Sequence, residues 1–266
     1  MRFILLILIT FSFNLFSEVP EPGYGLPELA SEQRIKELNT KKRAKIPSPS
    51  TQRKVQKLVD ALDEASIAEE EQRLLIKAKK INEAANKDII IEGAIRRAQS
   101  ELNDLKVRLD SLNSYDRSLY FYYQSYLNLA YQDDLPGAIN MYRSFIKEKD
   151  AQEKLKIDSY FTLAQLYMSE SNFKEGIKFL LDWFKNTPEV KPDAYVLLSQ
   201  AYYIQADEEK SKSEAKKIKG KAYNNVMEAK RLADETGITF KENWYSLLLA
   251  AMSELELKEE QVPLYV

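Results

Sequence analysis

Residues 160–167 read YFTLAQLY, and residues 195–202, thirty-five positions later, read YVLLSQAY. In both stretches a large aliphatic residue precedes a small one, Ala164 or Ser199, and an aromatic residue follows three positions on. A small residue at that place lets a paired helix cross closely, and the aromatic ring fills the space beside the crossing. A sequence period between about 20 and 50 residues is typical of a solenoid of stacked units.

The repeat register extends in both directions from this pair. The unit at 157–190 matches most fully, and its second helix is expected to end before Pro188, which cannot continue a helix. The unit that begins at residue 192 resumes its register only after a lysine-rich insertion, SKSEAKKIKGK at 211–221. Gly237 followed by Ile238 is typical of a glycine helix stop. The repeats are expected at about 119–150, 157–190, 192–237 and 241–266, the last one incomplete, within a repeat region at 113–266.

The composition agrees with a helical chain. Only 7 Gly and 9 Pro occur among 266 residues, which favours long helices with short connections. His and Cys are absent, which excludes Ser-His-Asp triads, thiol nucleophiles, disulfides and the usual zinc sites. No phosphate-binding glycine motif occurs, and a net charge of −2 gives no general attraction to nucleic acid. We therefore expect an all-α, non-enzymatic protein without cofactor, metal or nucleic-acid partner.

The N-terminus, MRFILLILITFSFNLFS at 1–17, is typical of a secretory signal peptide. Arg2 supplies the basic start, and the uncharged run at 3–16 is shorter than the about 20 residues that a membrane-spanning helix needs. Ser17 is an acceptable small residue before a cleavage site. This predicts a bacterial periplasmic protein. An uncleaved inner-membrane anchor is the alternative, because Leu15 is larger than a cleavage site prefers.

Two segments separate the signal peptide from the repeats. Residues 18–50 hold five of the nine prolines and a basic cluster at 41–45, which predicts a flexible linker. The cluster would be a solvated part of this linker, whereas contact with anionic lipid or an acidic partner is the alternative. Residues 51–112 carry two stripes of apolar residues spaced three and four apart. Two antiparallel helices would bury both stripes, with a break at 82–86 or at Gly93. A continuous coiled coil is the alternative.

The repeat resembles the tetratricopeptide repeat, which places small and aromatic residues at fixed positions of two paired helices and a proline near the end. The resemblance implies an α-solenoid of antiparallel helix pairs. It also implies that residues 51–112 form a divergent first repeat or a coiled-coil-like segment. An irregular helical bundle with aromatic cores is the alternative fold.

Longer strings resemble one bacterial family, the periplasmic tetratricopeptide proteins encoded with TonB energy-transduction systems. They read LNSYDR at 112–117, LLDWF at 180–184, DAYVLLSQAYY at 193–203 and KENWYSLLL at 241–249. Members are usually longer and lack the insertion at 211–221. The resemblance implies an accessory scaffold near the TonB, ExbB and ExbD proteins that supports uptake of iron chelates or other scarce nutrients.

A peptide-binding groove is the first candidate site, because tetratricopeptide solenoids hold extended or helical peptides on the first helices of their units. Aromatic and Met side chains dominate the positions that the register assigns to it, which favours an apolar or aromatic ligand segment. For each aromatic residue, packing against a neighbouring helix is the alternative. The candidates are Tyr120, Tyr123, Leu127, Phe161, Gln165, Met168, Val196, Gln200, Tyr203, Tyr245, Leu249 and Met252.

A basic surface is the second candidate site. It would meet anionic lipid headgroups or an acidic partner, whereas a solvated helix face is the alternative. The carboxylate pair Asp133/Asp134 and the pair Glu208/Glu209 fall at expected turns without an apolar pocket, which argues against a glycosidase site. The basic candidates are Lys210, Lys212, Lys216, Lys217, Lys219 and Lys221.

Two further functions are compatible with the sequence. One is an adaptor of another cell-envelope machine such as the Tol-Pal system, whose tetratricopeptide partner joins an N-terminal coiled coil to C-terminal repeats. A trimer with residues 51–112 as the coiled coil would favour it. The other is an enzyme acting on cell-wall glycans, for which the carboxylates at register positions of the groove, Asp158, Asp193 and Glu242, are the candidates.

Overall fold

The computed structural model describes residues 24–40 and 45–257, and this part of the chain is helical with no β-strand. The predicted all-α fold is therefore confirmed. The predicted signal peptide at 1–17 lies outside the described residues. The chain divides into two compact units: an N-terminal unit, residues 31–170, and a C-terminal unit, residues 171–266 with the segment up to residue 30.

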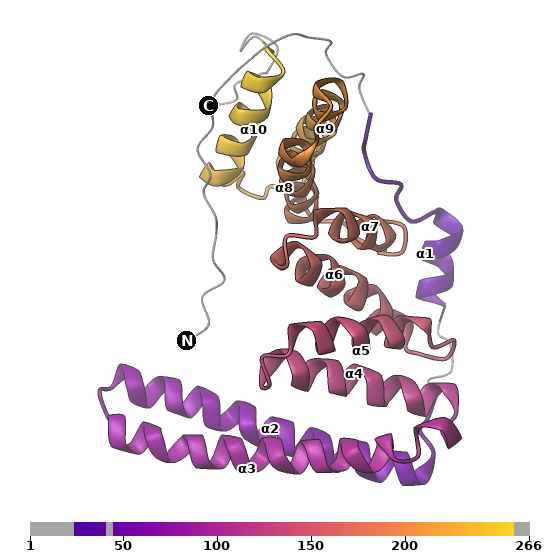
Figure 1. Cartoon of the computed structure of the whole chain (residues 1–266), viewed down its shortest axis with the longest axis vertical. Helices are drawn as coiled ribbons and strands as arrows, with labels where there is room; N and C mark the ends of the chain where they lie inside the picture. The colour runs from indigo at the N-terminus through magenta and orange to yellow at the C-terminus, as the bar shows by residue number, and fades with distance from the viewer. Residues whose placement is uncertain (1–23, 41–44, 258–266) are drawn as a thin grey trace. The chain divides into compact units, whose positions relative to one another are not determined.

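The helices of each unit follow one another with short connections (Figure 1). The N-terminal unit contains α1 (Glu32–Asn39), α2 (Pro49–Lys77), α3 (Ile81–Lys106), the 3-10 helix η1 (Leu109–Ser111), α4 (Ser114–Ala130), α5 (Leu135–Lys147) and α6 (Glu153–Ser169). The described part of the C-terminal unit contains α7 (Phe173–Phe184), α8 (Pro192–Glu208), α9 (Lys212–Thr236) and α10 (Glu242–Glu254). None of these helices is long and apolar enough to cross a membrane.

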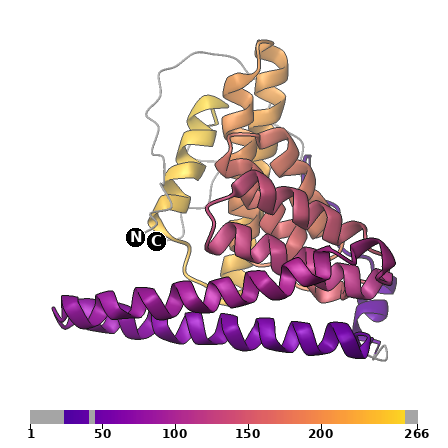
Figure 2. The same cartoon turned by 60° about the horizontal axis from the view of Figure 1, so that its bottom comes forward.

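Residues 49–106 form an antiparallel hairpin of α2 and α3, the first of the two arrangements expected for 51–112 (Figures 1 and 2). The chain turns at 78–80, where Lys79 adopts a left-handed conformation with a φ of 60°. The expected break at Gly93 is wrong, because Gly93 lies inside α3. Residues 82–86 likewise belong to α3, so the asparagines there do not end a helix.

The seam between α2 and α3 changes along the hairpin. Near α4 it is built from leucines, which form one cluster with Tyr120 and Leu127 of α4. Farther out the buried residues are alanines. Small side chains let two helices approach closely but bury little apolar surface. The alanines of the outer seam are Ala65, Ala68, Ala84 and Ala94.

The string LNSYDR at 112–117 anchors the start of α4. Asp116, buried at the junction with α2, accepts hydrogen bonds from the backbone N–H of Ser48 and the Thr51 hydroxyl, both at 3.1 Å. Its carboxylate thus serves the N-terminus of α2, where unpaired N–H groups favour a negative charge. The Asn113 side chain caps α4 by accepting from the Asp116 N–H.

The next contacts of this string tie α4 to the loop after α5. Arg117 donates two hydrogen bonds to Glu148, at 2.9 and 3.0 Å, and Ser114 donates a third at 2.7 Å. Gln152 donates to the Tyr115 hydroxyl at 3.0 Å. The string LNSYDR, one of those that carry the family resemblance, therefore holds α4 to the start of α2 and to the loop after α5.

In the C-terminal unit, α8 and α9 pack along each other with small residues at their seam. The hydroxyl of Ser199, which is fully buried, donates to the carbonyl oxygen of Ala222 at 2.7 Å. The prediction that residue 199 lies at a close helix crossing is thereby confirmed. The ring of Tyr195 lies beside that of Phe184, which joins α7 to this pair.

The insertion at 211–221 extends a helix and does not form a loop. Ser211 caps α9, and residues 212–221 make up its first turns, so α9 is 25 residues long, against 13 in α5 and 12 in α7. The helix ends at Gly237, whose φ is 69°, while the N–H of Ile238 returns to the carbonyl of Ala233. The predicted glycine helix stop is confirmed.

Candidate partner-binding surfaces

The candidate groove residues of α4 lie mostly in the core. Tyr120 and Leu127 are buried in the cluster with the hairpin leucines, and Tyr123 is half-buried against it. Burial raises the pKa of the Tyr120 and Tyr123 hydroxyls, which stay protonated at neutral pH. These three residues therefore pack against the hairpin, which is the alternative that was expected for the aromatic candidates.

On α6 the candidates differ in exposure. Gln165 is exposed, whereas Phe161 and Met168 are half-buried. Arg143 of α5 donates a hydrogen bond to the hydroxyl of Tyr167, a residue of the repeat string, at 3.0 Å. Gln165 is thus the candidate of the N-terminal unit that is freest to contact a ligand.

On α8 and α10 the register again assigns several core residues to the groove. Val196, Tyr203 and Met252 are buried, and Gln200 is half-buried. Tyr245 packs its half-buried ring against Phe240 at a centroid distance of 4.7 Å.

Leu249 is the exception among the candidates of the C-terminal unit, because 52% of it is exposed. The twelve candidates are therefore mainly packing residues. Gln165 and Leu249, one in each unit, remain accessible side chains.

Tyr203 belongs to a polar cluster that joins α8, α9 and α10. Its hydroxyl donates to Glu254 at 2.6 Å, and Lys219 pairs with both Glu254 and Asp207. Burial opposes the charge on Lys219, but hydrogen bonds to Glu254 and Asp207 outweigh it and raise the pKa of Lys219. Burial and the hydrogen bond to Glu254 raise the pKa of Tyr203 as well. The contacts of this cluster thus link α8, α9 and α10.

The six candidate lysines do not form one basic surface. Besides Lys219, Lys217 pairs with Glu214 at 3.3 Å, and the ammonium of Lys221 lies 5.6 Å from the ring centroid of Tyr202.

The remaining lysines differ in exposure. Lys210 and Lys212 are exposed at the α8–α9 turn, while Lys216 is half-buried. Two of the six lysines, Lys217 and Lys219, are therefore balanced by ion pairs.

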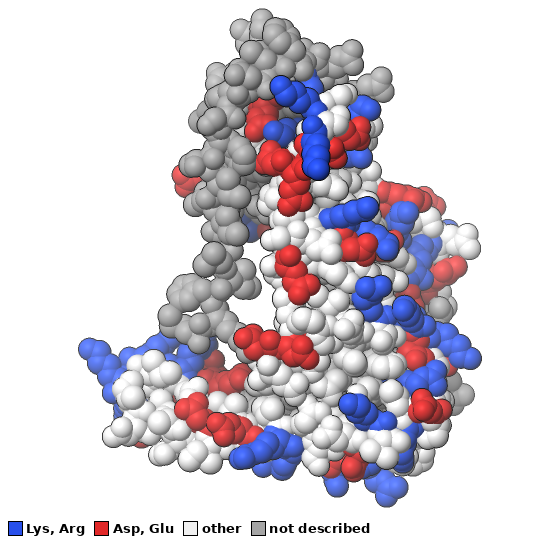
Figure 3. Space-filling model, in the orientation of Figure 1, with Lys and Arg blue, Asp and Glu red and all other residues white. Residues whose placement is uncertain are grey.

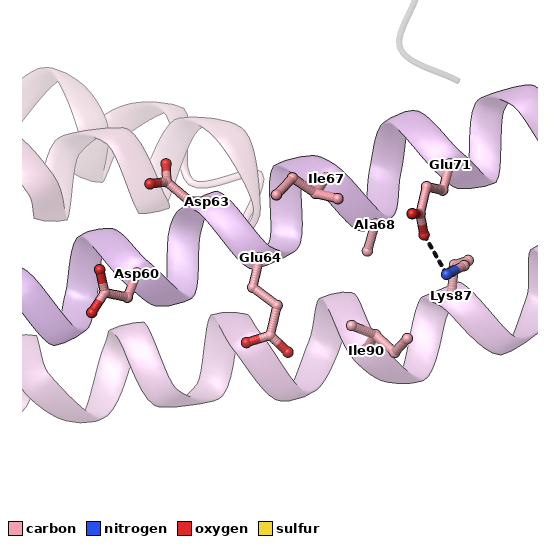
Figure 4. A pocket seen from close by; sticks show the side chains of 8 residues that line it. All are labelled: Asp60, Asp63, Glu64, Ile67, Ala68, Glu71, Lys87 and Ile90. Atoms are coloured by element: carbon pink, nitrogen blue, oxygen red, sulfur yellow. Dashed lines mark hydrogen bonds and ion pairs between the residues drawn. The ribbon is translucent and has the colours of Figure 1, made fainter.

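A shallow, open depression lies on the hairpin between α2 and α3 (Figure 4). Its acidic wall is partly neutralised, because Glu64 pairs with Arg97 at 2.5 Å and Glu71 pairs with Lys87. No enclosed, water-excluding space holds these carboxylates, so they have the ordinary character of surface groups. The lining residues are Asp60, Asp63, Glu64, Ile67, Ala68, Glu71, Lys87 and Ile90.

The outer half of the hairpin, defined here as residues 67–93, exposes large apolar side chains. Most of it runs beyond the end of α4 in both cartoon views (Figures 1 and 2), and at its inner end Glu69 is hydrogen-bonded to Tyr131, which follows α4. The hairpin turn adds Lys77, Lys79 and Lys80, and Figure 3 shows basic side chains at this end. The exposed apolar residues are Ile67, Leu74, Ile76, Ile81, Ile89 and Ile90. The sequence placed Ile67 in the apolar stripe that two paired helices would bury, and this expectation is wrong, because Ile67 is 62% exposed. The other five residues were not singled out from the sequence.

Residues 24–30 form a short segment that lies on α8 and α9 and was expected to belong to a flexible linker. Asn224 and Asn225 of α9 donate hydrogen bonds to the carbonyl oxygens of Tyr24 and Gly25, at 2.9 and 3.0 Å. Lys185 pairs with Glu28 at 3.3 Å. Only the pattern YGLPE at 24–28 and the two asparagines could have suggested this contact, and neither is a specific signal.

Among residues 24–40 and 45–257, no group of three or more His, Cys, Asp or Glu side chains is arranged to hold a metal ion. No protein-family model, curated protein or solved structure matches the chain. The surfaces above are therefore the basis for any functional conclusion.

Proposed function

We propose that this protein is a non-enzymatic periplasmic adaptor of tetratricopeptide type, which binds protein partners of a TonB–ExbB–ExbD nutrient uptake system. The observation that carries the binding role is the outer half of the hairpin. Six large apolar side chains are exposed there, mostly beyond the end of α4. A concentration of exposed large apolar side chains on a protein marks a candidate protein–protein interaction site.

The tetratricopeptide part of the proposal rests on repeated local features. Ala164 and Ser199, thirty-five residues apart, are both fully buried, as the repeat requires of its small position. The helices α4, α6 and α8 each have 17 residues, and each is followed after a short connection by another helix. These features support stacked helix pairs.

A binding role is favoured over catalysis by the state of the ionisable clusters. Asp116 is saturated with hydrogen bonds from the ends of α2 and α4, and the Tyr203 cluster is balanced in charge. Neither is a titratable group set apart in a ligand-sized cavity, which is what a catalytic acid or base requires. The choice of the TonB system rests on the resemblance of the sequence strings alone.

The Tol-Pal alternative is less well supported. It would be favoured by residues 51–112 acting as one continuous coiled-coil strand. Residues 51–112 instead fold back on themselves at 78–80, with α2 packed antiparallel on α3.

The proposal is tested by affinity capture from detergent extracts of cells expressing tagged TonB, ExbB or ExbD from the same genome. We expect the protein to be retained by at least one of them. The triple variant Ile67→Ser/Leu74→Ser/Ile90→Ser should reduce retention at least about tenfold. The control Val107→Ser removes an apolar side chain that is 87% exposed but lies at the other end of the hairpin, and it should bind normally. Failure of all three baits to retain the protein would refute the TonB assignment.

A further inference from the structure

The segment 24–30 and the surface beneath it have the features of a peptide and its binding site. The amides of two successive asparagines on α9 donate to two successive peptide carbonyls, those of Tyr24 and Gly25. Hydrogen bonds to the carbonyl groups of an extended peptide bind its backbone whatever its sequence. Contacts with the side chains then determine which sequences are preferred. Such donors are fixed in position because α9 packs closely on α8.

Gly25 makes the closest approach. Its φ of 77° lies in the left-handed region, and a Cβ atom at this position would meet the Cβ of Lys221 at 2.7 Å and its Cα at 3.0 Å. Any other residue would therefore be strained in its backbone and would also collide with α9. The site selects glycine at this position on two independent grounds.

Three neighbouring contacts define the rest of the segment. The ammonium of Lys221 lies 5.7 Å from the ring centroid of Tyr24 and 5.6 Å from that of Tyr202. Pro27 is buried, and Lys185 pairs with the Glu28 carboxylate at 3.3 Å. The site thus accommodates an aromatic residue, a glycine, a half-buried leucine, a proline and an acid in that order.

Part of the segment stays accessible to solvent. Tyr24 is 42% exposed and Leu29 49% exposed, whereas Leu26 is half-buried and Pro27 is buried. The ion pair of Lys185 with Glu28 is also exposed, and such pairs contribute little. Asn225, which is fully buried in the site, has a side-chain oxygen without a hydrogen-bond partner among the described residues.

We propose that the α8–α9 surface around Lys221, Asn224 and Asn225 is a peptide-recognition site that residues 24–30 occupy as an intramolecular strap. A partner protein with an extended aromatic-Gly-Leu-Pro-acid segment binds there by displacing the strap. The proposal goes beyond the adaptor role above and does not depend on which envelope system is served. It concerns a site within the C-terminal unit that the repeat register does not include among the groove positions.

The strap competes through its covalent linkage. Because the strap is part of the same chain, its effective concentration at the site is on the order of 1 mM. A free peptide of the same sequence therefore competes poorly with the strap until the strap is weakened. Gly25→Ala weakens the strap without altering the surface of α9. It is therefore the variant that opens the site.

The test uses the purified protein and a fluorescent synthetic peptide of sequence EPGYGLPELA, that of residues 21–30. Fluorescence anisotropy should show that the Gly25→Ala protein binds this peptide at least about tenfold more tightly than the wild-type protein does. The matched peptide EPGYALPELA should not bind. Adding Asn224→Ala, at a partly exposed position that leaves the α8–α9 seam intact, should weaken binding by the Gly25→Ala protein.

Several results would overturn the proposal. One is equal, or no, binding of the peptide by wild-type and Gly25→Ala proteins, and another is equal binding of the two peptides. A third is a wild-type dimer that Gly25→Ala dissociates, because the segment would then dock on a second copy. All these measurements use the chain alone, so their outcome is separate from capture by the TonB proteins.

Discussion

The outer half of the α2–α3 hairpin and the α8–α9 pair share one kind of seam but differ in what surrounds it. Both pairs meet through small buried residues, alanines in the hairpin, and Ser199 with Ala222 in α8–α9. Beside the seam of α8–α9, the tyrosines 195, 202 and 203 are buried. Beside the seam of the hairpin, isoleucines such as Ile67 and Ile90 face solvent.

The difference shows that a close helix pair does not complete a core by itself. A small-residue seam brings two helices together, but most apolar burial comes from the side chains flanking it, once a third element covers them. In the C-terminal unit, α7, α10 and segment 24–30 supply that cover. Where cover is missing, the flanking side chains are available to another protein.

The largest expected effect compares the two ends of the hairpin. Leu102→Ala empties a fully buried position of the leucine cluster and should lower the free energy of unfolding by about 2–5 kcal/mol. Ile90→Ala in the outer half should change it by no more than about 0.5 kcal/mol. Urea unfolding followed by circular dichroism measures both values. If Leu102→Ala and Ile90→Ala lowered the free energy of unfolding by similar amounts, the outer half would be packed as tightly as the rest of the hairpin.

The attachment of the hairpin to α4 should be nearly as sensitive. Asp116→Ala leaves the Ser48 N–H, the Thr51 hydroxyl and the Asn113 amide without their buried acceptor, which should cost about 1–3 kcal/mol. Asp60, which accepts a hydrogen bond from Gln56 on the exposed face of α2, provides the control. Thermal unfolding of the Asp60→Ala protein should match that of the wild type. A wild-type melting curve for Asp116→Ala would contradict the anchoring role.

A smaller effect is expected from pH at the loop after α5. Burial alone would raise the pKa of Glu148, but hydrogen bonds from Arg117 and Ser114 outweigh it and lower the pKa below the usual value of about 4.3. The carboxylate therefore contributes stability above that usual value, and the contribution is lost as the pH falls through the lowered pKa.

Glu148→Gln should accordingly destabilise the protein more at pH 7 than at pH 3, as measured by urea unfolding at both values. The exposed Glu92, changed to Gln, serves as the control. A Glu148→Gln penalty that is the same at both pH values would show that charge has no part in the contact.

The smallest effects come from two glycines, one in each region. Gly237 ends α9 with a φ of 69° and has open space around it, so Gly237→Ala should cost about 1 kcal/mol through backbone strain alone. Gly93 lies inside α3 with only the end of Arg97 nearby, so Gly93→Ala should stabilise the hairpin by about 0.5–1 kcal/mol. Thermal unfolding should therefore show a lower melting temperature for Gly237→Ala and a higher one for Gly93→Ala. A lower melting temperature for Gly93→Ala would mean that another part of the protein already covers the surface at Gly93.

Sequence reasoning predicted the features that depend on local spacing. The helical class, the small residue at 199 and the stop at Gly237 follow from periodicity and glycine conformation, and the structure contains all three. The turn at 78–80 was missed because LLIKAKKI at 74–81 contains neither glycine nor proline.

Groove positions and docked segments were harder to predict, because burial depends on elements distant in sequence. Tyr120 and Met252 occupy register positions assigned to a groove, yet helices elsewhere in their units bury them. The contact of Gly25 with Asn225 joins residues 200 positions apart, so no local pattern encodes it.

Amide hydrogen exchange of the whole protein tests the central contrast most directly, because it reports local opening residue by residue. We predict that amides in the outer half of the hairpin, residues 67–93, exchange at least about tenfold faster than those at 98–105 and at 195–229. Equal protection of the outer half and the α8–α9 pair would contradict the claim that one region is complete and the other is open to a partner.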